Sequence, residues 1–214
     1  MAMLCTAALA RRAHAAWATD GSAVVTGPYA QTQVTPVPDA EGGVFFAWLD
    51  ADSGWNTDIL AVRWSSTAAT QPGWTPGGDR VTDIACDKLN PAAAADGAGG
   101  AVLAWEDNRC VGYYQIYARR LAPGGLAAAG WPANGVRIAA TGLNQRTPAI
   151  AGDGAGGAFV AWTDLRAPDG DIYLQHVDGS GNTVAGWPAA GLGVGTGAAA
   201  QSAPVVAPDG AGGV

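Results

Sequence analysis

One motif, Asp-x-x-Gly-Gly, recurs at nearly constant spacing along this chain of 214 residues. The intervals between its copies are 57, 57 and 56 residues, and the copies begin at Asp39, Asp96, Asp153 and Asp209. Two columns of tryptophan follow the same period: Trp48, Trp105 and Trp162 in one, and Trp17, Trp74, Trp131 and Trp187 in the other. A fixed period is the sequence signature of a repeat architecture, so the chain is built from copies of one unit.

Each unit contains short apolar runs that predict strands. In the third complete copy the runs are PAIAGDG, GAFVAWTD, DIYLQHVDG and GLGVGTG, all bounded by glycine, aspartate or proline. The second run is apolar on both faces, so both faces must be covered. Blades of a propeller meet that demand, because each sheet packs between two neighbours. We therefore predict an all-β fold, a β-propeller of four-stranded antiparallel blades with about 57 residues each. The alternatives are a β-solenoid and an array of small β-modules.

The aligned columns divide the chain into units. We expect a partial blade of C-terminal strands over residues 1–33, three blades over 34–90, 91–147 and 148–203, and the start of a further blade over 204–214. This division predicts an incomplete ring, in which the chain is a piece of a longer protein. The alternative is a closed four-bladed ring, in which the N-terminal partial unit completes the C-terminal one.

The composition argues against two classes of partner. The net charge is −7 and Lys88 is the single lysine, whereas nucleic-acid binding needs a basic patch. No apolar run reaches the roughly 18 residues of a membrane span. The first residues contain a short apolar piece, but Arg11 and Arg12 follow it, whereas a signal peptide carries its positive charge before the apolar core. These residues are therefore expected to belong to a repeat.

A family resemblance is carried by the segment DGAGGAFVAWTDLRAPDGDIYLQHVDGSG. It resembles the repeats of TolB-like β-propellers, which carry a Pro-Asp-Gly turn, an aromatic-containing strand, an Asp-x-Arg turn and an Asp-Ile-Tyr strand. The matching residues are Pro208-Asp209-Gly210, Trp162, Asp164, Arg166 and Asp171-Ile172-Tyr173. The repeat is also similar to the Asp-box of sialidase-like propellers, although Trp162 lies further from Asp153 than the aromatic residue of that box. The resemblance implies a WD40-like blade in an exported protein and leaves the activity open.

A charged pair follows the first tryptophan column in two units. Asp107 with Arg109, and Asp164 with Arg166, sit directly after the predicted central strand. They could form a polar binding rim, or each aspartate could cap turn amides beside its arginine. Because the pair recurs from blade to blade, the structural interpretation is favoured.

Two further patterns suggest ligands. Asp50, Asp52 and Asp58 present oxygen atoms near alternate positions, as a calcium loop would, although Gly54 and Trp55 depart from that pattern. A solvated acidic turn is the competing interpretation, and no other cofactor is indicated. The string of residues 152–157 matches G-x-G-x-x-G, but it opens a strand and recurs as a turn, so it is not a dinucleotide site.

The cysteines indicate an oxidising compartment. Cys86 precedes the second complete blade and Cys110 lies in a loop of that blade, and these two loops emerge on one face of a propeller. We therefore predict a disulfide between them, which is typical of exported proteins. Cys5 is left over.

The function predicted from these observations is a non-catalytic binding or scaffold module for a protein or a glycan. It would be secreted, periplasmic or at the cell surface. No catalytic residue is assigned, because His14 and His176 occupy unrelated positions and no paired carboxylates stand out. The alternatives are a sialidase-like or other glycan-processing enzyme, and a structural spacer in a surface protein.

Overall fold

The computed structural model describes residues 18, 20–51, 56–126 and 128–214. Within these ranges the strands form three antiparallel sheets of four. The first sheet holds β1 (Gln31–Pro38), β2 (Val44–Ala51), β3 (Thr57–Trp64) and β4 (Asp79–Arg80). The second holds β5 (Lys88–Ala95), β6 (Ala101–Asp107), β7 (Gln115–Leu121) and β8 (Val136–Arg137). The third holds β9 (Gln145–Gly152), β10 (Ala158–Asp164), β11 (Asp171–Val177) and β12 (Leu192–Gly195).

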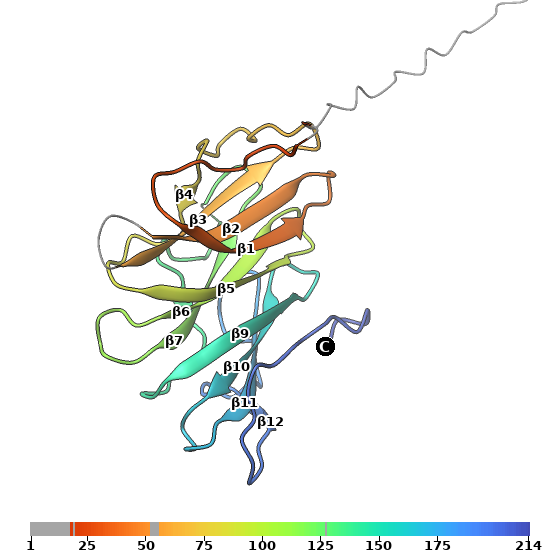
Figure 1. The fold of residues 1–214 in the computed structure, drawn as a ribbon. Helices are drawn as coiled ribbons and strands as arrows, with labels where there is room; N and C mark the ends of the chain where they lie inside the picture. Colours follow the sequence, from red (N-terminus) through yellow and green to blue (C-terminus); the bar gives the residue numbers. More distant parts are fainter. Residues whose placement is uncertain (1–17, 19, 52–55, 127) are drawn as a thin grey trace, which may run out of the picture.

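The three sheets are arranged as successive blades of a β-propeller (Figure 1). In each sheet the strands pair in chain order, from the first strand to the fourth. The first strands, β1, β5 and β9, lie beside one another, and β5 and β9 also contact the second and third strands of the preceding sheet. These first strands therefore form the inner edge of the assembly. Each begins three residues before the boundary that the repeat columns suggested.

The core is split between the junctions of neighbouring blades. Every residue of β6 is buried, yet its two faces pack against different sheets. Leu103 and Trp105 join the core cluster of the first blade, whereas Val102 and Ala104 join that of the third. The double-sided apolar pattern thus reflects burial on both faces of the blade.

The recurring aspartate builds the turn between the first two strands of each blade. Asp96 Oδ1 accepts hydrogen bonds from the backbone N–H groups of Ala98, at 2.6 Å, and Gly100, at 2.8 Å. Its other oxygen, Oδ2, accepts from Arg120 Nε at 2.7 Å. The same arrangement repeats for Asp39 with Arg63 and for Asp153 with His176. The carboxylates of the motif are therefore turn caps that also hold the third strand.

The tryptophans of the first column are all buried and lie against the same part of their blades. Trp48, Trp105 and Trp162 are 1%, 0% and 0% exposed. Each ring tip lies against a glycine that precedes the fourth strand, and a Cβ atom there would overlap the ring: Gly78, Gly135 and Gly191.

The second tryptophan column links one blade to the next. Trp74 Nε1 donates to the carbonyl oxygen of Pro123 at 3.0 Å, and Trp131 Nε1 donates to that of Gly179 at 2.9 Å. Each acceptor lies in a turn of the following blade. Trp17 falls outside the described residues, and so does most of the partial blade expected over residues 1–33.

Candidate functional site

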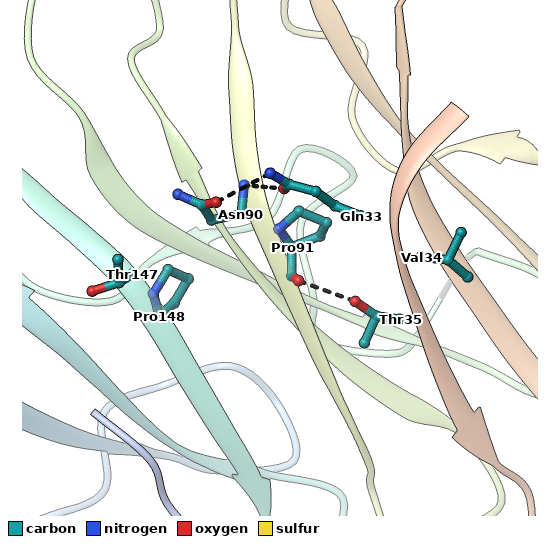
Figure 2. Close-up of a pocket in the computed structure, with 7 residues that line it drawn as sticks. All are labelled: Gln33, Val34, Thr35, Asn90, Pro91, Thr147 and Pro148. Carbon is teal, nitrogen blue, oxygen red and sulfur yellow. Dashed lines mark hydrogen bonds between the residues drawn. The ribbon is translucent and has the colours of Figure 1, made fainter. Parts of the chain in front are cut away.

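A groove of about 330 Å³ crosses the inner strands of all three blades (Figure 2). The seven residues that line it are Gln33, Val34 and Thr35 on β1, Asn90 and Pro91 on β5, and Thr147 and Pro148 on β9. None of these side chains carries a charge. The groove therefore offers amide, hydroxyl and apolar surfaces to a ligand.

The backbone of the groove has the same unusual conformation in each blade. Gln33, Asn90 and Thr147 have φ angles of 52°, 50° and 50°, in the left-handed region that side chains disfavour. Each of them lies where the pairing register with the second strand is interrupted. Non-glycine residues held in this conformation cluster at functional sites, because only the surrounding structure can maintain them.

Hydrogen bonds join the strands across the groove, as Figure 2 shows. Gln33 Nε2 donates to Asn90 Oδ1 at 3.3 Å, and the backbone N–H of Asn90 donates to Gln33 Oε1 at 3.0 Å. Thr35 Oγ1 donates to the carbonyl oxygen of Pro91 at 3.1 Å. Gln33 and Thr35 of the first blade thus hold Asn90 and Pro91 of the second blade in place.

The buried carboxylate of Glu106 accepts hydrogen bonds from two residues that line the groove. Glu106, on β6, is 0% exposed and accepts from Asn90 Nδ2 at 2.6 Å and from the backbone N–H of Thr147 at 2.7 Å. Arg146 Nη1 donates to its second oxygen at 2.8 Å. Glu106 therefore fixes two groove residues and is neutralised by a third neighbour.

Glu106 and its neighbours break the repeat. Leu49 and Thr163 occupy the positions that correspond to Glu106 in the other two blades. The guanidinium group of Arg146 also lies over the ring of Tyr114, at 3.9 Å from its centroid. Burial and the carboxylate of Asp87 raise the pKa of Tyr114. Sequence reasoning assigned no role to Glu106 or Arg146, although their departure from the repeat was a signal that could have identified them.

The predicted rim residues do not line the groove and are engaged within their own blades. Arg166 donates two hydrogen bonds to Asp164, at 2.8 Å and 2.7 Å, and its guanidinium group lies 3.7 Å from the centroid of Tyr173. Trp162 Nε1 donates to the same carboxylate at 2.9 Å. Although burial opposes the effect, the bonds from Arg166 and Trp162 lower the pKa of Asp164.

The second blade repeats this cluster with Asp107, Arg109 and Tyr117. Both aspartates are buried and also cap the backbone N–H of their arginine, at 2.9 Å in each case. In the first blade, by contrast, the buried Trp48 Nε1 has no hydrogen-bond partner among the described residues. The structure thus brings each predicted rim pair together as an Asp–Arg–Tyr cluster, and each arginine also donates to a carbonyl oxygen in the loop before the outer fourth strand, at Asn134 and Ala190.

Of the three aspartates considered as calcium ligands, Asp58 is already paired with basic side chains of the protein. Asp58 accepts a hydrogen bond from the fully buried Lys88 Nζ at 3.0 Å and forms an ion pair with Arg80, whose Nη1 lies 2.7 Å from its other oxygen. Asp50 accepts from Gln31 Nε2 at 3.1 Å. Asp52 lies outside the described residues. Within the part of the chain that is described, no cluster of three or more histidine, cysteine or acidic side chains could hold a metal ion.

The predicted disulfide is confirmed. Cys86 and Cys110 are bonded, with Cα atoms 5.7 Å apart and a sequence separation of 24. The bond joins the loop before β5 to the loop after β6, at the end of the second blade where the inner strands begin. It therefore ties together two loops beside the candidate site.

No protein-family model matches the chain, and no curated protein sequence matches it. Several solved structures are similar to it, including the following three. A thermostable family-43 glycoside hydrolase has a TM-score of 0.46 and 12% identity over 74% of this chain and 55% of its own. A protein of unknown function from Dyadobacter fermentans has a TM-score of 0.45 and 14% identity over 73% of this chain and 54% of its own. An endo-arabinase from Bacteroides thetaiotaomicron has a TM-score of 0.47 and 17% identity over 82% of this chain and 67% of its own.

The chain spans about half the length of the first two of these structures. With TM-scores below 0.5, these similarities carry no argument about activity. The propeller assignment rests on the arrangement of the three sheets. Across the described ranges, no helix is long and apolar enough to cross a membrane.

Proposed function

We propose that the chain is a non-catalytic binding module that holds an uncharged glycan in the groove across β1, β5 and β9. The observation that carries this proposal is the uniformly neutral lining of the groove. Amide and hydroxyl groups can both donate and accept hydrogen bonds, as sugar hydroxyls require. Val34, Pro91 and Pro148 offer apolar surface on which the carbon face of a sugar ring can lie.

The left-handed backbone supports the same proposal. Holding Gln33, Asn90 and Thr147 in that conformation costs on the order of 1–3 kcal/mol each. Regular β pairing would avoid this cost, whereas the interruption turns polar side chains toward the groove in three successive blades. The buried Glu106 holds two of them by hydrogen bonds, which favours a site that must keep its shape.

A glycan-processing enzyme is the second candidate, and Glu106 is the observation that favours it. This carboxylate breaks the repeat and hydrogen-bonds two residues that line the groove. Hydrolysis of a glycosidic bond needs two carboxyl groups that face the sugar, and no carboxylate lines the groove. Glu106 is also fully buried and accepts three hydrogen bonds, so we favour a structural role for it.

The disulfide supports an exported location. Disulfides persist in oxidising compartments and are rare in the cytosol of most organisms. We therefore include a secreted, periplasmic or cell-surface location in the proposal. The structural-spacer alternative would leave the groove without a ligand.

The test is binding of neutral oligosaccharides to the purified chain. Asn90→Gly removes the groove amide while glycine accepts the φ angle of 50°. The matched control is Ala203→Gly, because Ala203 has a φ of 52° but does not line the groove. We expect Asn90→Gly to weaken binding at least about tenfold, or about 1.4 kcal/mol, and the control to bind as the unaltered chain does.

Two outcomes would overturn the proposal. One is that no neutral oligosaccharide binds at millimolar concentration, and the other is that Asn90→Gly binds as the unaltered chain does. Release of reducing sugar from a bound oligosaccharide, lost in Glu106→Gln, would favour the enzyme instead.

A further inference from the structure

The two loops joined by the disulfide have an unusual backbone. Cys86, Arg109 and Cys110 have φ angles of 96°, 40° and 58°, on the left-handed side that residues with a Cβ atom disfavour. The φ of Cys86 also lies beyond the small left-handed region, at roughly 50–70°, that such residues enter. Each of the three residues therefore costs backbone free energy that the surrounding structure must offset.

The third blade contains the equivalent of the Cys86 loop without this distortion. The loop between β8 and β9 is as long as the loop between β4 and β5, and Leu143 occupies in it the position of Cys86. Leu143 lies in the described part of the chain and is not left-handed. Because the two loops agree in length and place, the distortion at Cys86 accompanies the disulfide, which the third blade lacks.

Arg109 and Arg166 differ in the same way. Each donates from its backbone N–H to the aspartate two positions earlier, and each lies over a tyrosine ring. Arg166 is not left-handed, and its Nε and Nη2 donate to Asp164 at 2.8 Å and 2.7 Å. Arg109 Nε instead lies 3.4 Å from Asp107 Oδ2 and, although buried, makes no hydrogen bond to any described residue. The left-handed backbone of Arg109 thus accompanies an unsatisfied guanidinium donor.

The cross-linked state therefore carries two costs that the third blade avoids. One is the left-handed backbone at three residues with side chains. The other is a buried N–H that has lost its hydrogen bond to water without gaining an acceptor. Opening the disulfide allows the loop after β6 to take the conformation of the loop after β10, in which both costs are absent.

One partner of the disulfide is accessible from solvent. Cys110 is exposed, whereas Cys86 is only 7% exposed. Exposed or strained disulfides are the labile ones, and a thiolate opens them through a mixed disulfide. The first thiolate of a dithiol bonds to the Cys110 sulfur and releases Cys86 as a thiolate, and the second thiolate then releases Cys110. The dithiol becomes a disulfide, and its two electrons and two protons pass to the two cysteines.

We propose that the Cys86–Cys110 bond is a redox switch that a dithiol opens, and that its opening reshapes the loop of residues 108–112. In the reduced state Arg109 leaves the left-handed region and donates two hydrogen bonds to Asp107, as its counterpart does in the third blade. Val111, which is 56% exposed beside Cys110, moves with the loop, so the surface of the second blade changes at this end.

The switch acts on the loop and leaves the neighbouring inner strand in place. Thr57 Oγ1 donates to the carbonyl oxygen of Lys88, the first residue of β5, and Lys88 Nζ donates to Asp58 at 3.0 Å. Both contacts join β5 to the first blade without the disulfide. The inference therefore does not depend on a glycan in the groove.

The first test measures how readily the bond is reduced. The 214-residue chain, with Cys5→Ser so that a third thiol cannot exchange, is equilibrated with mixtures of reduced and oxidised dithiothreitol, and the new thiols are alkylated and counted by mass. Arg109→Asn and Arg109→Gln form a matched pair, because both replace the guanidinium group by an amide but asparagine tolerates the left-handed backbone better. We expect Arg109→Asn to need about a fivefold higher ratio of reduced to oxidised dithiothreitol for half-reduction than Arg109→Gln. Equal ratios would overturn the inference.

The second test follows the loop itself by NMR of the same Cys5→Ser chain before and after reduction. We expect the backbone and Nε–H signals of Arg109 to move toward those of Arg166, whose own signals stay unchanged. The loop after β6 is one residue longer than the loop after β10. If Arg109 keeps its left-handed φ after reduction, this extra residue rather than the disulfide sets the φ, and the inference is wrong. Loss of the folded-state indole signal of Trp162 on reduction would show that the bond holds the fold together, which would also overturn the switch.

Discussion

The indole Nε1 of Trp131 donates a hydrogen bond of 2.9 Å to the carbonyl oxygen of Gly179 on the neighbouring blade. This bond repeats between Trp74 and Pro123 one blade earlier. The bond recurs after 57 residues because the turn after the third strand of each blade contacts the tryptophan loop of the preceding blade. The regular tryptophans therefore serve packing between blades, whereas Glu106 and Arg146, which support the candidate groove, depart from the repeat.

The bond from Trp131 gives a first prediction. Trp131→Phe keeps an aromatic ring but leaves the carbonyl of Gly179 without its donor, at a cost of about 1 kcal/mol in the free energy of unfolding beyond the loss of ring contacts. Trp187→Phe is the control, because the Trp187 indole has no acceptor among the described residues. Urea denaturation should show the larger loss for Trp131→Phe, and equal losses would contradict the linking role.

The contact of Gly191 with Trp162 gives a second prediction. A Cβ at Gly191 would overlap the buried indole ring, whereas a Cβ at Gly186 would meet nothing within 4 Å. Both glycines have left-handed backbones, with φ angles of 80° and 91°, so both alanine variants carry similar backbone strain. We expect Gly191→Ala to be less stable than Gly186→Ala by about 2 kcal/mol, measured by thermal unfolding. Equal stabilities would mean that the ring can shift away freely.

Asp164 predicts an acid-dependent stability. Hydrogen bonds from Arg166 and Trp162 lower its pKa despite the opposing effect of burial. A carboxyl group with a lowered folded-state pKa stabilises the fold above its unfolded pKa of about 3.9, and this contribution is lost as the pH falls through the folded value. Asp164→Asn should therefore flatten the fall in unfolding free energy between about pH 5 and pH 2. An unchanged slope in urea titrations would contradict the assignment.

The Cys86–Cys110 bond predicts a sensitivity to reductant. Because the two cysteines are separated by 24 positions in sequence, cross-linking should reduce the entropy of the unfolded chain and stabilise the fold by about 3 kcal/mol. The double variant Cys86→Ala with Cys110→Ala should be destabilised by about that amount, and its stability should not change on adding reductant. If the unaltered chain unfolds at the same urea concentration with and without reductant, the bond does not contribute as proposed.

The period of the sequence predicted much of the fold. The two tryptophan columns and the Asp-x-x-Gly-Gly turn carried the blade architecture, because blade packing requires the same residues at every junction. Asp107 and Asp164 were favoured as turn caps for the same reason, and the structure shows both capping the backbone of the following arginine.

The groove could not be predicted from the period. Its defining feature is the left-handed backbone at Gln33, Asn90 and Thr147, which are three different residue types that share no propensity signal for that conformation. Glu106 is one of only two glutamates, but its role depends on donors from residues 16 and 41 positions away, which only the packed blades bring together.

The most direct test of the account maps where a neutral oligosaccharide binds. Backbone amide shifts of the isotope-labelled chain are recorded by NMR during titration with the tightest oligosaccharide from the binding screen. The account predicts the largest shifts at Gln33, Asn90 and Thr147 and along the adjoining inner strands. Shifts confined to the outer strands β4, β8 and β12, with the inner strands unchanged, would contradict it.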